Sequence, residues 1–356
     1  MIQFIIKRIG YGVLVMAGVT FVVFSLFNFL PVDPARLTLG QRADVESVEA
    51  IRKELGLDKP KGQQLIDYMH DVSPISIHQR TAKAKEKYNY VGLIPMGKVV
   101  LAAKKPYLRR SYQTKRKVDE VLMAALPKTA ILALSAIIIA CIIGITLGMI
   151  AAVKQHSIFD NVAMSVSVLG ISVPSYLSAM ILSFLFGILW HKWTGLNFMG
   201  DLTVFDDYGN ERFEFKNLIL PAIALGVRPI GVIFQLTRSA MLDVLSQDYI
   251  RTARAKGLAF GKILYKHALR NAMNPVLTAV SGWFASLLAG SYFVEIIFDI
   301  KGLGYVTVNN LLNFDFPVAM GAVLFTAAVF VIINIFVDIL YGILDPRIGV
   351  GLSLIH

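Results

Sequence analysis

Long stretches without a single charged residue constrain this chain more than any other feature of its sequence. Five of them cover residues 9–32, 129–153, 161–191, 271–294 and 316–337. An ionisable side chain is costly inside the hydrocarbon of a bilayer, and a helix needs about 20 apolar residues to cross it. Each stretch is therefore long enough to form a membrane-spanning helix.

One further stretch can span a bilayer although it contains a charge. Residues 217–236 are interrupted only by Arg228 and include Pro221 and Pro229, which membrane helices tolerate where neighbours satisfy the freed backbone groups. Charged residues make up 17% of the 356 residues, against about 25% in soluble domains. The sequence predicts an all-α membrane protein with six transmembrane helices.

The distribution of lysine and arginine predicts the orientation, because short cytoplasmic loops are enriched in both. With a cytoplasmic N-terminus, the inner segments are 1–8, 154–160, 238–270 and the tail after 338, and they hold eleven lysines and arginines. The short outer segments, 192–216 and 295–315, hold four. Both termini are therefore expected in the cytoplasm, and the first span is expected to be retained rather than cleaved as a signal peptide.

The predicted spans divide the chain into four parts. We expect residues 1–32 to be the cytoplasmic N-terminus and first helix, 33–121 an extracytoplasmic insertion between helices 1 and 2, 122–342 the core with helices 2–6, and 343–356 a cytoplasmic tail. Within the insertion, residues 45–57 predict a surface helix, and HQRTAKAKEKYNY, residues 78–90, lacks apolar periodicity and predicts irregular structure. Inner-face charge and the insertion account for the net charge of +11, so no nucleic-acid partner is expected.

The most basic segment of the core is residues 247–275, with six lysines and arginines against one aspartate. Asp248 is a predicted N-cap for a helix over 249–256, and Gly257 suits the left-handed position that ends such a helix. A second helix is expected from about residue 260 to 273. Lys262, Lys266 and Arg270 then lie four apart on one face, where like charges repel.

Two interpretations of this segment follow from its residues. Lipid headgroups together with the charge bias of cytoplasmic loops explain the lysine and arginine ladder. Alternatively, the segment docks onto a cytoplasmic partner, since Arg251 and Arg254 offer guanidiniums for carboxylates and the small Thr252, Ala253 and Ala255 allow close approach.

The residues here also carry a family resemblance. TARAKG (252–257) and HALRNAMNP (267–275) resemble the cytoplasmic coupling loop of binding-protein-dependent ABC-transporter permeases, specifically B-type subunits of the subfamily importing dipeptides, oligopeptides and nickel. The resemblance extends in order along the chain through FLPVDPA (29–35), LGISVPSY (169–176), LTRSAMLDVLSQDYIRTARAKGL (236–258), VEIIFDIKGLG (294–304) and LYGILDPR (340–347). Two departures stand out: Arg251-Thr252-Ala253 replaces the usual Glu-Ala-Ala, and residues 59–110 are longer than the family's usual link.

The resemblance implies a type-1 ABC importer permease in the bacterial plasma (inner) membrane. A homologous second permease subunit would complete the pathway, two cytoplasmic ABC ATPase subunits would hydrolyse ATP, and an extracytoplasmic solute-binding protein would deliver the solute. The cytoplasmic loop 238–275 would contact the ATPase, through the ATPase-coupling residues Asp248, Tyr249, Arg251, Thr252, Ala253, Arg254, Ala255, Lys256 and Gly257.

The chain itself is expected to bind no cofactor. GLAFGKI, residues 257–263, is its nearest approach to a phosphate loop, but it has three residues instead of four before Gly-Lys and has Ile263 where a magnesium-binding hydroxyl is needed. ATP would therefore be used only by partner subunits. The lone Cys141 leaves no disulfide framework or Cys-rich metal site.

Arg228 and the residues around Pro174 are the candidate substrate-pathway residues. A charge within a span faces a bundle interior or an aqueous cavity, so Arg228 either lines the passage or pairs with a polar neighbour or a backbone carbonyl. Pro174, with Ser172 and Ser175, either breaks the third helix and exposes carbonyls to the passage or makes a packing kink. Glu295 lies near a span end, where a solvated side chain is expected.

Other function classes fit the sequence less well. HExxH and GxSxG motifs are absent and the six histidines are scattered, which argues against an intramembrane enzyme. The spans hold few of the acidic residues that a proton relay needs, which argues against a secondary transporter, although a self-sufficient channel or transporter stays an alternative. Within the importer architecture, nickel or metal-chelate import stays open beside peptide import.

Overall fold

The computed structural model describes residues 2–29, 45–54 and 56–344, and these form two compact units. One unit consists of residues 1–125 with 306–331, and the other of 126–305 with the chain beyond 331. Three helices, α6 (Val118–Val153), α15 (Leu303–Leu312) and α16 (Phe316–Leu344), run from one unit into the other. Each unit is described by itself below.

Five described helices are long and apolar enough to cross a membrane. They are α1 (Ile2–Phe29), α6, α10 (Lys216–Leu245), the helix over Phe260–Ala289, and α16. The pair formed by α7 (Ile158–Ser172) with α8 (Ser175–Leu182) and the π-helix η2 (Ser183–Leu189) is also long and apolar enough when it is taken together. Counted as one span, this bent pair brings the five helices to the expected six.

The bend in the third span is 106° and lies at Pro174. Val173, directly before this proline, is extended with ψ 125°, as expected because the proline ring disfavours helical backbone at the preceding residue. Of the two interpretations of Pro174, the helix break is confirmed, and residues 161–191 are not one helix. The chain continues through the short α9 (His191–Thr194) and a hairpin of β4 (Thr203–Phe205) and β5 (Glu211–Phe213) before entering α10.

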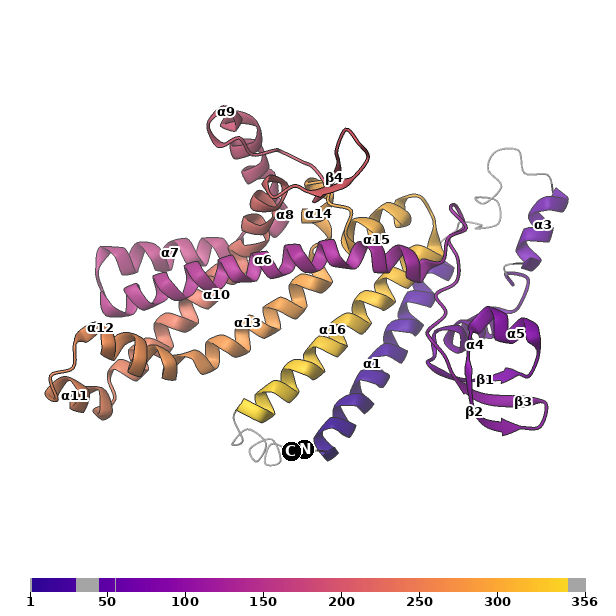
Figure 1. Cartoon of the computed structure of the whole chain (residues 1–356), viewed down its shortest axis with the longest axis horizontal. Coiled ribbons are helices and arrows are strands. Elements are labelled where there is room, and N and C mark those ends of the chain that lie inside the picture. Colours follow the sequence, from indigo (N-terminus) through magenta and orange to yellow (C-terminus); the bar gives the residue numbers. More distant parts are fainter. Residues whose placement is uncertain (1, 30–44, 55, 345–356) are drawn as a thin grey trace. The chain divides into compact units, whose positions relative to one another are not determined.

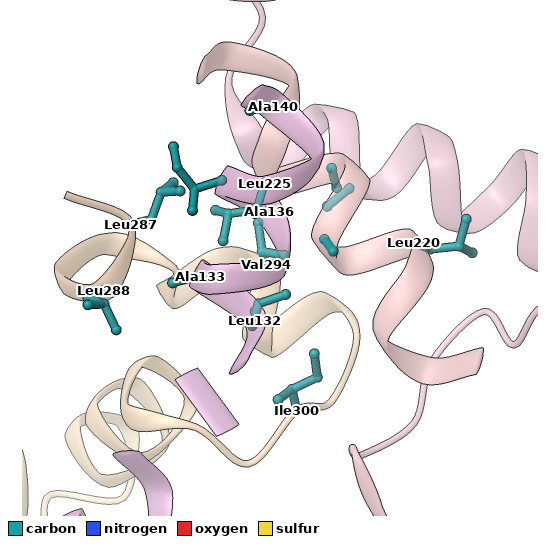
Figure 2. Packing of buried hydrophobic residues seen from close by; sticks show 14 of the residues in the cluster. Leu132, Ala133, Ala136, Ala140, Leu220, Leu225, Leu287, Leu288, Val294 and Ile300 are labelled. Carbon is teal, nitrogen blue, oxygen red and sulfur yellow. The ribbon is translucent and has the colours of Figure 1, made fainter. Parts of the chain in front are cut away.

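The second unit is built around α10, which packs against α7, α8 and α13 (Arg270–Gly290) (Figure 1). Figure 2 shows its hydrophobic core, where side chains of α6 and α10 meet the end of α13, α14 (Tyr292–Ile297) and Ile300. Close approach of α6 to α10 depends on glycine: a Cβ at Gly144 would lie 2.8 Å from Ile233, and one at Gly148 would lie 2.7 Å from the Phe234 carbonyl oxygen. At these two positions a small residue is what allows the close packing of the helices.

The first unit contains a small α/β element between the first two spans. Helices α3 (Val45–Glu54) and α4 (Lys61–Val72) precede β1 (Ile75–Gln79), α5 (Ala82–Tyr88), β2 (Val91–Met96) and β3 (Val99–Ala103). The three strands form an antiparallel sheet in the order β1–β3–β2. Aromatic contacts of His78 with His70 on α4 and Tyr88 on α5 join the sheet to both helices.

The prediction of irregular structure over residues 78–90 is wrong. Thr81 caps the N-terminus of α5 by accepting a hydrogen bond from the Ala84 amide, and Asn89 ends the helix in the left-handed conformation at φ 44°. The strand β1 does alternate between buried and exposed residues, but its buried positions are Ser76 and His78. Because the inward side chains are polar, a search for alternating apolar residues misses this strand. Helix α3 confirms the predicted surface helix and ends earlier than expected.

Candidate functional site

The predicted coupling segment forms a short helix, α11 (Asp248–Ala255), that begins one residue earlier than expected. Its N-cap is Gln247, in extended conformation, so the prediction of Asp248 as the N-cap is wrong. Asp248 lies in the first turn instead, where a carboxylate is favourable near the positive end of the helix dipole. Its carboxylate also lies 3.5 Å from the Arg251 guanidinium, but both side chains are largely exposed and this pair adds little stability.

The C-terminus of α11 is fixed by its glycine, as predicted. Gly257 has φ +75°, and its amide donates to the Arg254 carbonyl at 2.9 Å, while the Leu258 amide donates to the Ala253 carbonyl at 3.3 Å. These two bonds are those of a Schellman motif, which satisfies carbonyls left over at the helix end. Leu258 packs in the same hydrophobic cluster as Ala253, completing the motif's usual apolar contact.

One side of α11 packs against a hydrophobic cluster, which we call the seat of α11. Ile250 is fully buried and Ala253 is 8% exposed, and both belong to a cluster drawn from three other helical segments. Those segments contribute Met149 and Ala152 from α6, Met241 from α10, and Ile263, Ala268 and Ala272 from the stretch that leads into α13. The Asn271 side chain also donates to the Tyr249 hydroxyl at 2.9 Å. α11 is therefore packed against the ends of three long helices.

The opposite side of α11 is open. Of the nine residues predicted to contact an ATPase, Ala253 alone is buried in the seat, and the others are exposed: Asp248, Tyr249, Arg251, Thr252, Arg254, Ala255, Lys256 and Gly257. This exposed set carries three cations against one carboxylate. We call it the α11 surface.

The second helix of the basic segment does not end near residue 273, as predicted, but continues. Helix α12 (Phe260–Lys262) passes into the π-helix η3 (Ile263–Leu269) and then into α13 without a break, giving one helix over Phe260–Ala289. A π-turn contains more residues than an α-turn, so Lys262, Lys266 and Arg270 do not follow one straight ladder. The basic segment and the fifth span are thus parts of a single helix.

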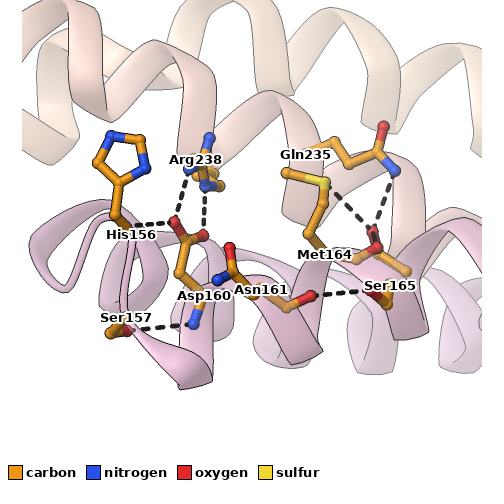
Figure 3. A network of polar contacts seen from close by, with 9 residues as sticks. His156, Ser157, Asp160, Asn161, Met164, Ser165, Gln235 and Arg238 are labelled. Atoms are coloured by element: carbon orange, nitrogen blue, oxygen red, sulfur yellow. Dashed lines mark hydrogen bonds and ion pairs between the residues drawn. The ribbon is translucent and has the colours of Figure 1, made fainter.

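A buried ion pair that the sequence did not predict lies between α7 and α10. The Asp160 carboxylate faces the Arg238 guanidinium, with side-chain exposures of 2% and 18% (Figure 3). Asp160 also accepts from the His156 amide at 2.9 Å, and its own amide donates to the Ser157 hydroxyl that caps α7. One step along the same interface, the Gln235 side chain donates to the Ser167 hydroxyl at 3.0 Å. From the sequence both residues were expected in loops, and they lie 78 positions apart.

Arg228 lies beside the break in the third span. Its Nε donates to the Ile171 carbonyl at 3.3 Å, and its guanidinium lies 5.9 Å from the centre of the Trp283 ring. A carbonyl in the last turn of a helix has no partner within that helix, so Arg228 supplies one for α7. Arg228 nevertheless stays exposed in this chain.

The three other pathway candidates lie at the same break. Ser172 is exposed and donates to the Val168 carbonyl at 2.9 Å, which turns its hydroxyl back onto α7. Pro174 is exposed and Ser175 half-buried. The structure thus brings the end of α7, the start of α8 and Arg228 of α10 together.

Glu295 is completely buried, so the expectation of a solvated side chain is wrong for it. Its carboxylate accepts from the Thr129 hydroxyl at 2.8 Å, the Ser291 hydroxyl at 2.6 Å and the Tyr305 amide at 3.0 Å. Burial raises the pKa of this carboxyl above its usual range, against the opposing effect of these donors. Gly302 and Gly304 let the loop fold onto it, since a Cβ at Gly302 would lie 2.5 Å from Oε2.

Comparison with known proteins gives the same family for both ends of the chain. The family described as "Binding-protein-dependent transport system inner membrane component" matches residues 144–350, and its N-terminal counterpart matches residues 1–133. The dipeptide transport system permease protein DppB of Escherichia coli (strain K12) is 35% identical over 370 residues, which cover 98% of this chain and 99% of the relative.

Two further relatives are similar over the same extent. The di/tripeptide transport system permease protein DppB of Pseudomonas aeruginosa (strain UCBPP-PA14) is 35% identical over 363 residues, and a putative peptide transport system permease protein of Brucella abortus (strain 2308) is 37% identical over 349. Both alignments cover 98% of this chain and 99% of the relative.

The fold is also found among solved structures. The MetNI methionine ABC transporter in inward-facing conformations aligns with a TM-score of 0.50 at 15% identity, over 64% of this chain and 97% of that one. At this identity the likeness is one of fold. It agrees with the type-1 importer permease architecture expected from the sequence.

Proposed function

The chain belongs to the family of binding-protein-dependent transport system inner membrane components, and we propose that it is the permease subunit of an ATP-driven peptide importer, moved through the α11 surface. The observation that carries this proposal is the two-sided environment of α11. Its apolar side is held by α6, α10 and the helix leading into α13, while its cationic side is free for a partner.

This arrangement supports a mechanical role for α11. A partner that moves the helix displaces its seat, and the seat contains residues from three long helices. Packed interiors transmit displacement because they are dense and resist deformation. Closure of an ATPase pair would therefore reorient the spans, which is a gating step rather than chemistry in this chain.

The partners follow from the same proposal. Two cytoplasmic ATPase subunits would supply the energy, a solute-binding protein outside the membrane would deliver the peptide, and a second, homologous permease would complete the passage. Six crossings return the chain to its starting side, so both termini would be cytoplasmic, together with α11. The excess of lysine and arginine in the corresponding short loops supports this orientation.

Within the passage, Arg228 is the proposed peptide contact, with Ser172, Pro174 and Ser175 beside it. Its guanidinium already binds the broken end of α7 through the Ile171 carbonyl, and the side chain stays exposed and so is accessible to a ligand. A guanidinium binds carboxylates in a forked, directional geometry, which suits the C-terminus of a peptide.

Charge reversal on the α11 surface tests the coupling. We expect Arg254→Glu to lower co-purification with the ATPase subunits of the source organism and to lower ATP-driven dipeptide uptake by about tenfold or more, because a contact of about 1.4 kcal/mol or more is lost. Arg212→Glu is the matched control, since Arg212 is equally exposed but lies on β5. Full uptake and co-purification by Arg254→Glu would refute the proposal.

A separate variant tests the passage. Arg228→Gln should reduce dipeptide uptake while leaving ATPase co-purification unchanged, because Arg228 is far along the sequence from α11 and outside its seat.

Uptake of a nickel chelate instead of a dipeptide by the unaltered complex would shift the assignment to metal import. Conduction by the purified chain alone would indicate a channel.

A further inference from the structure

The first unit contains a cavity that the transport function leaves without a role. It has a volume of about 680 Å³, within the range of ligand-binding cavities, and lies between α4, α5 and the segment that follows β3. Its charged lining consists of six cations and two carboxylates: Lys53, Lys59, Lys87, Arg109, Arg110, Lys115, Asp67 and Asp71. The rings of Tyr88, Tyr107 and Tyr112 complete its walls.

Both carboxylates are already neutralised. Asp67 pairs with Lys59 at 2.6 Å, and Asp71 pairs with Arg109 at 2.9 Å and accepts from the Tyr88 hydroxyl at 2.8 Å. The other four cations, Lys53, Lys87, Arg110 and Lys115, have no carboxylate partner in the part of the chain that the structure describes. Several unbalanced cations around one concave surface concentrate positive potential and attract anions.

The cationic wall is held in place from outside the cavity. The turn over residues 110–117 is closed by the Ser111 amide donating to the Arg116 carbonyl, and the Ser111 hydroxyl and Tyr112 amide donate to the buried carboxylate of Asp315 at 2.5 and 3.0 Å. Arg109 and Lys115 have φ +67° and +58°, a conformation that is unfavourable for their side chains. Residues held in such a conformation are typical of binding sites, where the surrounding structure stabilises them.

Residues next to the cavity pack against the end of the first membrane span. Tyr68 of α4 lies 5.9 Å from Phe24, and α1 is apolar over Ile6–Phe27, so Phe24 is one turn inside the end of that span. Asp71 follows Tyr68 by one helical turn, and the Arg109 guanidinium lies 5.1 Å from the centre of the Tyr68 ring. Tyr112 belongs to the same hydrophobic cluster as Phe24. The cavity therefore lies beside the last turns of the apolar stretch of α1.

We propose that this cavity binds the phosphate headgroup of an anionic phospholipid. Arginine donates to phosphate through paired N–H groups, lysine adds point charge, and tyrosine is favoured where apolar and polar environments meet. The headgroup would balance Arg110, Lys115, Lys87 and Lys53, and its acyl chains would follow the apolar surface of α1. The bound lipid fixes the insertion at the membrane surface. This inference does not depend on which solute is transported.

Lipid retention by the purified full-length chain tests the proposal. Native mass spectrometry would count lipids retained after exchange into phosphatidylglycerol or phosphatidylcholine at equal concentration. We expect the unaltered cavity to retain one phosphatidylglycerol. Arg110→Gln/Lys115→Gln should retain it about tenfold more weakly, because each lysine or arginine near an anionic headgroup attracts it and this variant removes two of them. Arg80→Gln/Lys98→Gln removes the same charge from exposed positions outside the cavity and should retain the lipid as before.

Several outcomes would overturn the proposal. Equal retention of phosphatidylglycerol and phosphatidylcholine would show that the headgroup charge plays no role. Equal loss of lipid in both double variants would indicate a general electrostatic attraction to the protein instead of a binding site. If inorganic phosphate at the same concentration as the lipid prevented retention of phosphatidylglycerol, the cavity would be assigned to a soluble anion. If Arg110→Gln/Lys115→Gln fails to fold, Lys53→Gln/Lys87→Gln, at two other lining positions, should show the same weakening of lipid retention, and no weakening would count against the site.

Discussion

The Asp160 carboxylate receives two hydrogen bonds from the Arg238 guanidinium, from Nε to Oδ1 at 2.5 Å and from Nη2 to Oδ2 at 2.7 Å. This forked pair joins the first turn of α7 to the part of α10 that leads into α11. Asp160 lies in the first turn of α7 and Arg238 about two turns before the end of α10, so the pair fixes the relative position of these two spans. It is a structural support for the coupling proposed here.

Breaking this pair on one side should be costly. Arg238→Ala leaves the Asp160 carboxylate buried without its main partner, and we expect a loss of about 3 kcal/mol in the free energy of unfolding. Asp160→Asn/Arg238→Gln removes both charges and should cost less than the single change. Denaturant unfolding of the detergent-solubilised chain measures the difference, and a double variant less stable than Arg238→Ala would contradict the expectation.

The left-handed glycine that ends α11 gives a second prediction. Gly257→Ala places a Cβ at φ +75° and should cost about 1 kcal/mol locally, loosening the turn that positions the α11 surface and lowering ATP-driven uptake. Gly261→Ala is the control, because Gly261 is helical and a Cβ there meets nothing within 4 Å. Uptake assays in proteoliposomes compare the two; equal uptake would show that the turn geometry is unimportant.

The buried Glu295 carboxylate leaves no room for a side chain at Gly302. Gly302→Ala would put its Cβ 2.5 Å from both Glu295 Oε2 and Thr129 Oγ1, and overpacking of this kind costs about 1–3 kcal/mol. The melting temperature should fall accordingly. Gly282→Ala on α13, where a Cβ meets nothing within 4 Å, should leave melting unchanged, and similar melting of both variants would argue against a rigid loop around Glu295.

His78 makes the stability of the small sheet depend on pH. Burial, followed by the nearby His70 and Lys104, lowers the pKa of His78 from 6.5 to about 4, while Asp71 opposes and Lys87 adds to the shift. Because the pKa of His78 in the folded state lies below its pKa in the unfolded state, the contribution of neutral His78 to the free energy of unfolding is complete above about pH 6.5. It is lost as pH falls through that value toward about 4, and it amounts to about 2–3 kcal/mol.

Hydrogen-exchange mass spectrometry of the full chain measures this dependence. Protection of peptides from β1 and β3, corrected for the intrinsic pH dependence of exchange, should fall between pH 6.5 and 4. His78→Gln should flatten the profile, and His156→Gln, at an exposed turn before α7, should leave it intact. A profile that is steep in both variants would assign the pH dependence to other groups.

Local signals in the sequence predicted much of this protein. Charge-free runs located the spans, because desolvation of charge is costly wherever a helix crosses a bilayer. Pro174 located the break in the third span and Gly257 the end of α11, because both act through the geometry of one or two residues. Motifs distributed along the chain identified the family, which the comparisons confirm.

Other local predictions failed where a neighbouring element decided the outcome. Residues 78–90 form the end of β1 and α5 because β1 turns polar side chains toward α4 and α5, an arrangement in which apolar periodicity carries no signal. Asp248 is a reasonable cap by residue type, but the helix begins at a position where Gln247 takes that place. The helix expected to end near residue 273 continues into α13.

The sequence by itself determined which segments enter the membrane, where two of them break or end, and to which family the chain belongs. Only the tertiary structure decided which distant polar groups meet: Asp160 with Arg238, Thr129 with Glu295, and Ser111 with Asp315. The physical reason is that hydrophobic burial and backbone propensity act on neighbouring residues, whereas the partner of a buried charge depends on how helices are packed and rotated against each other.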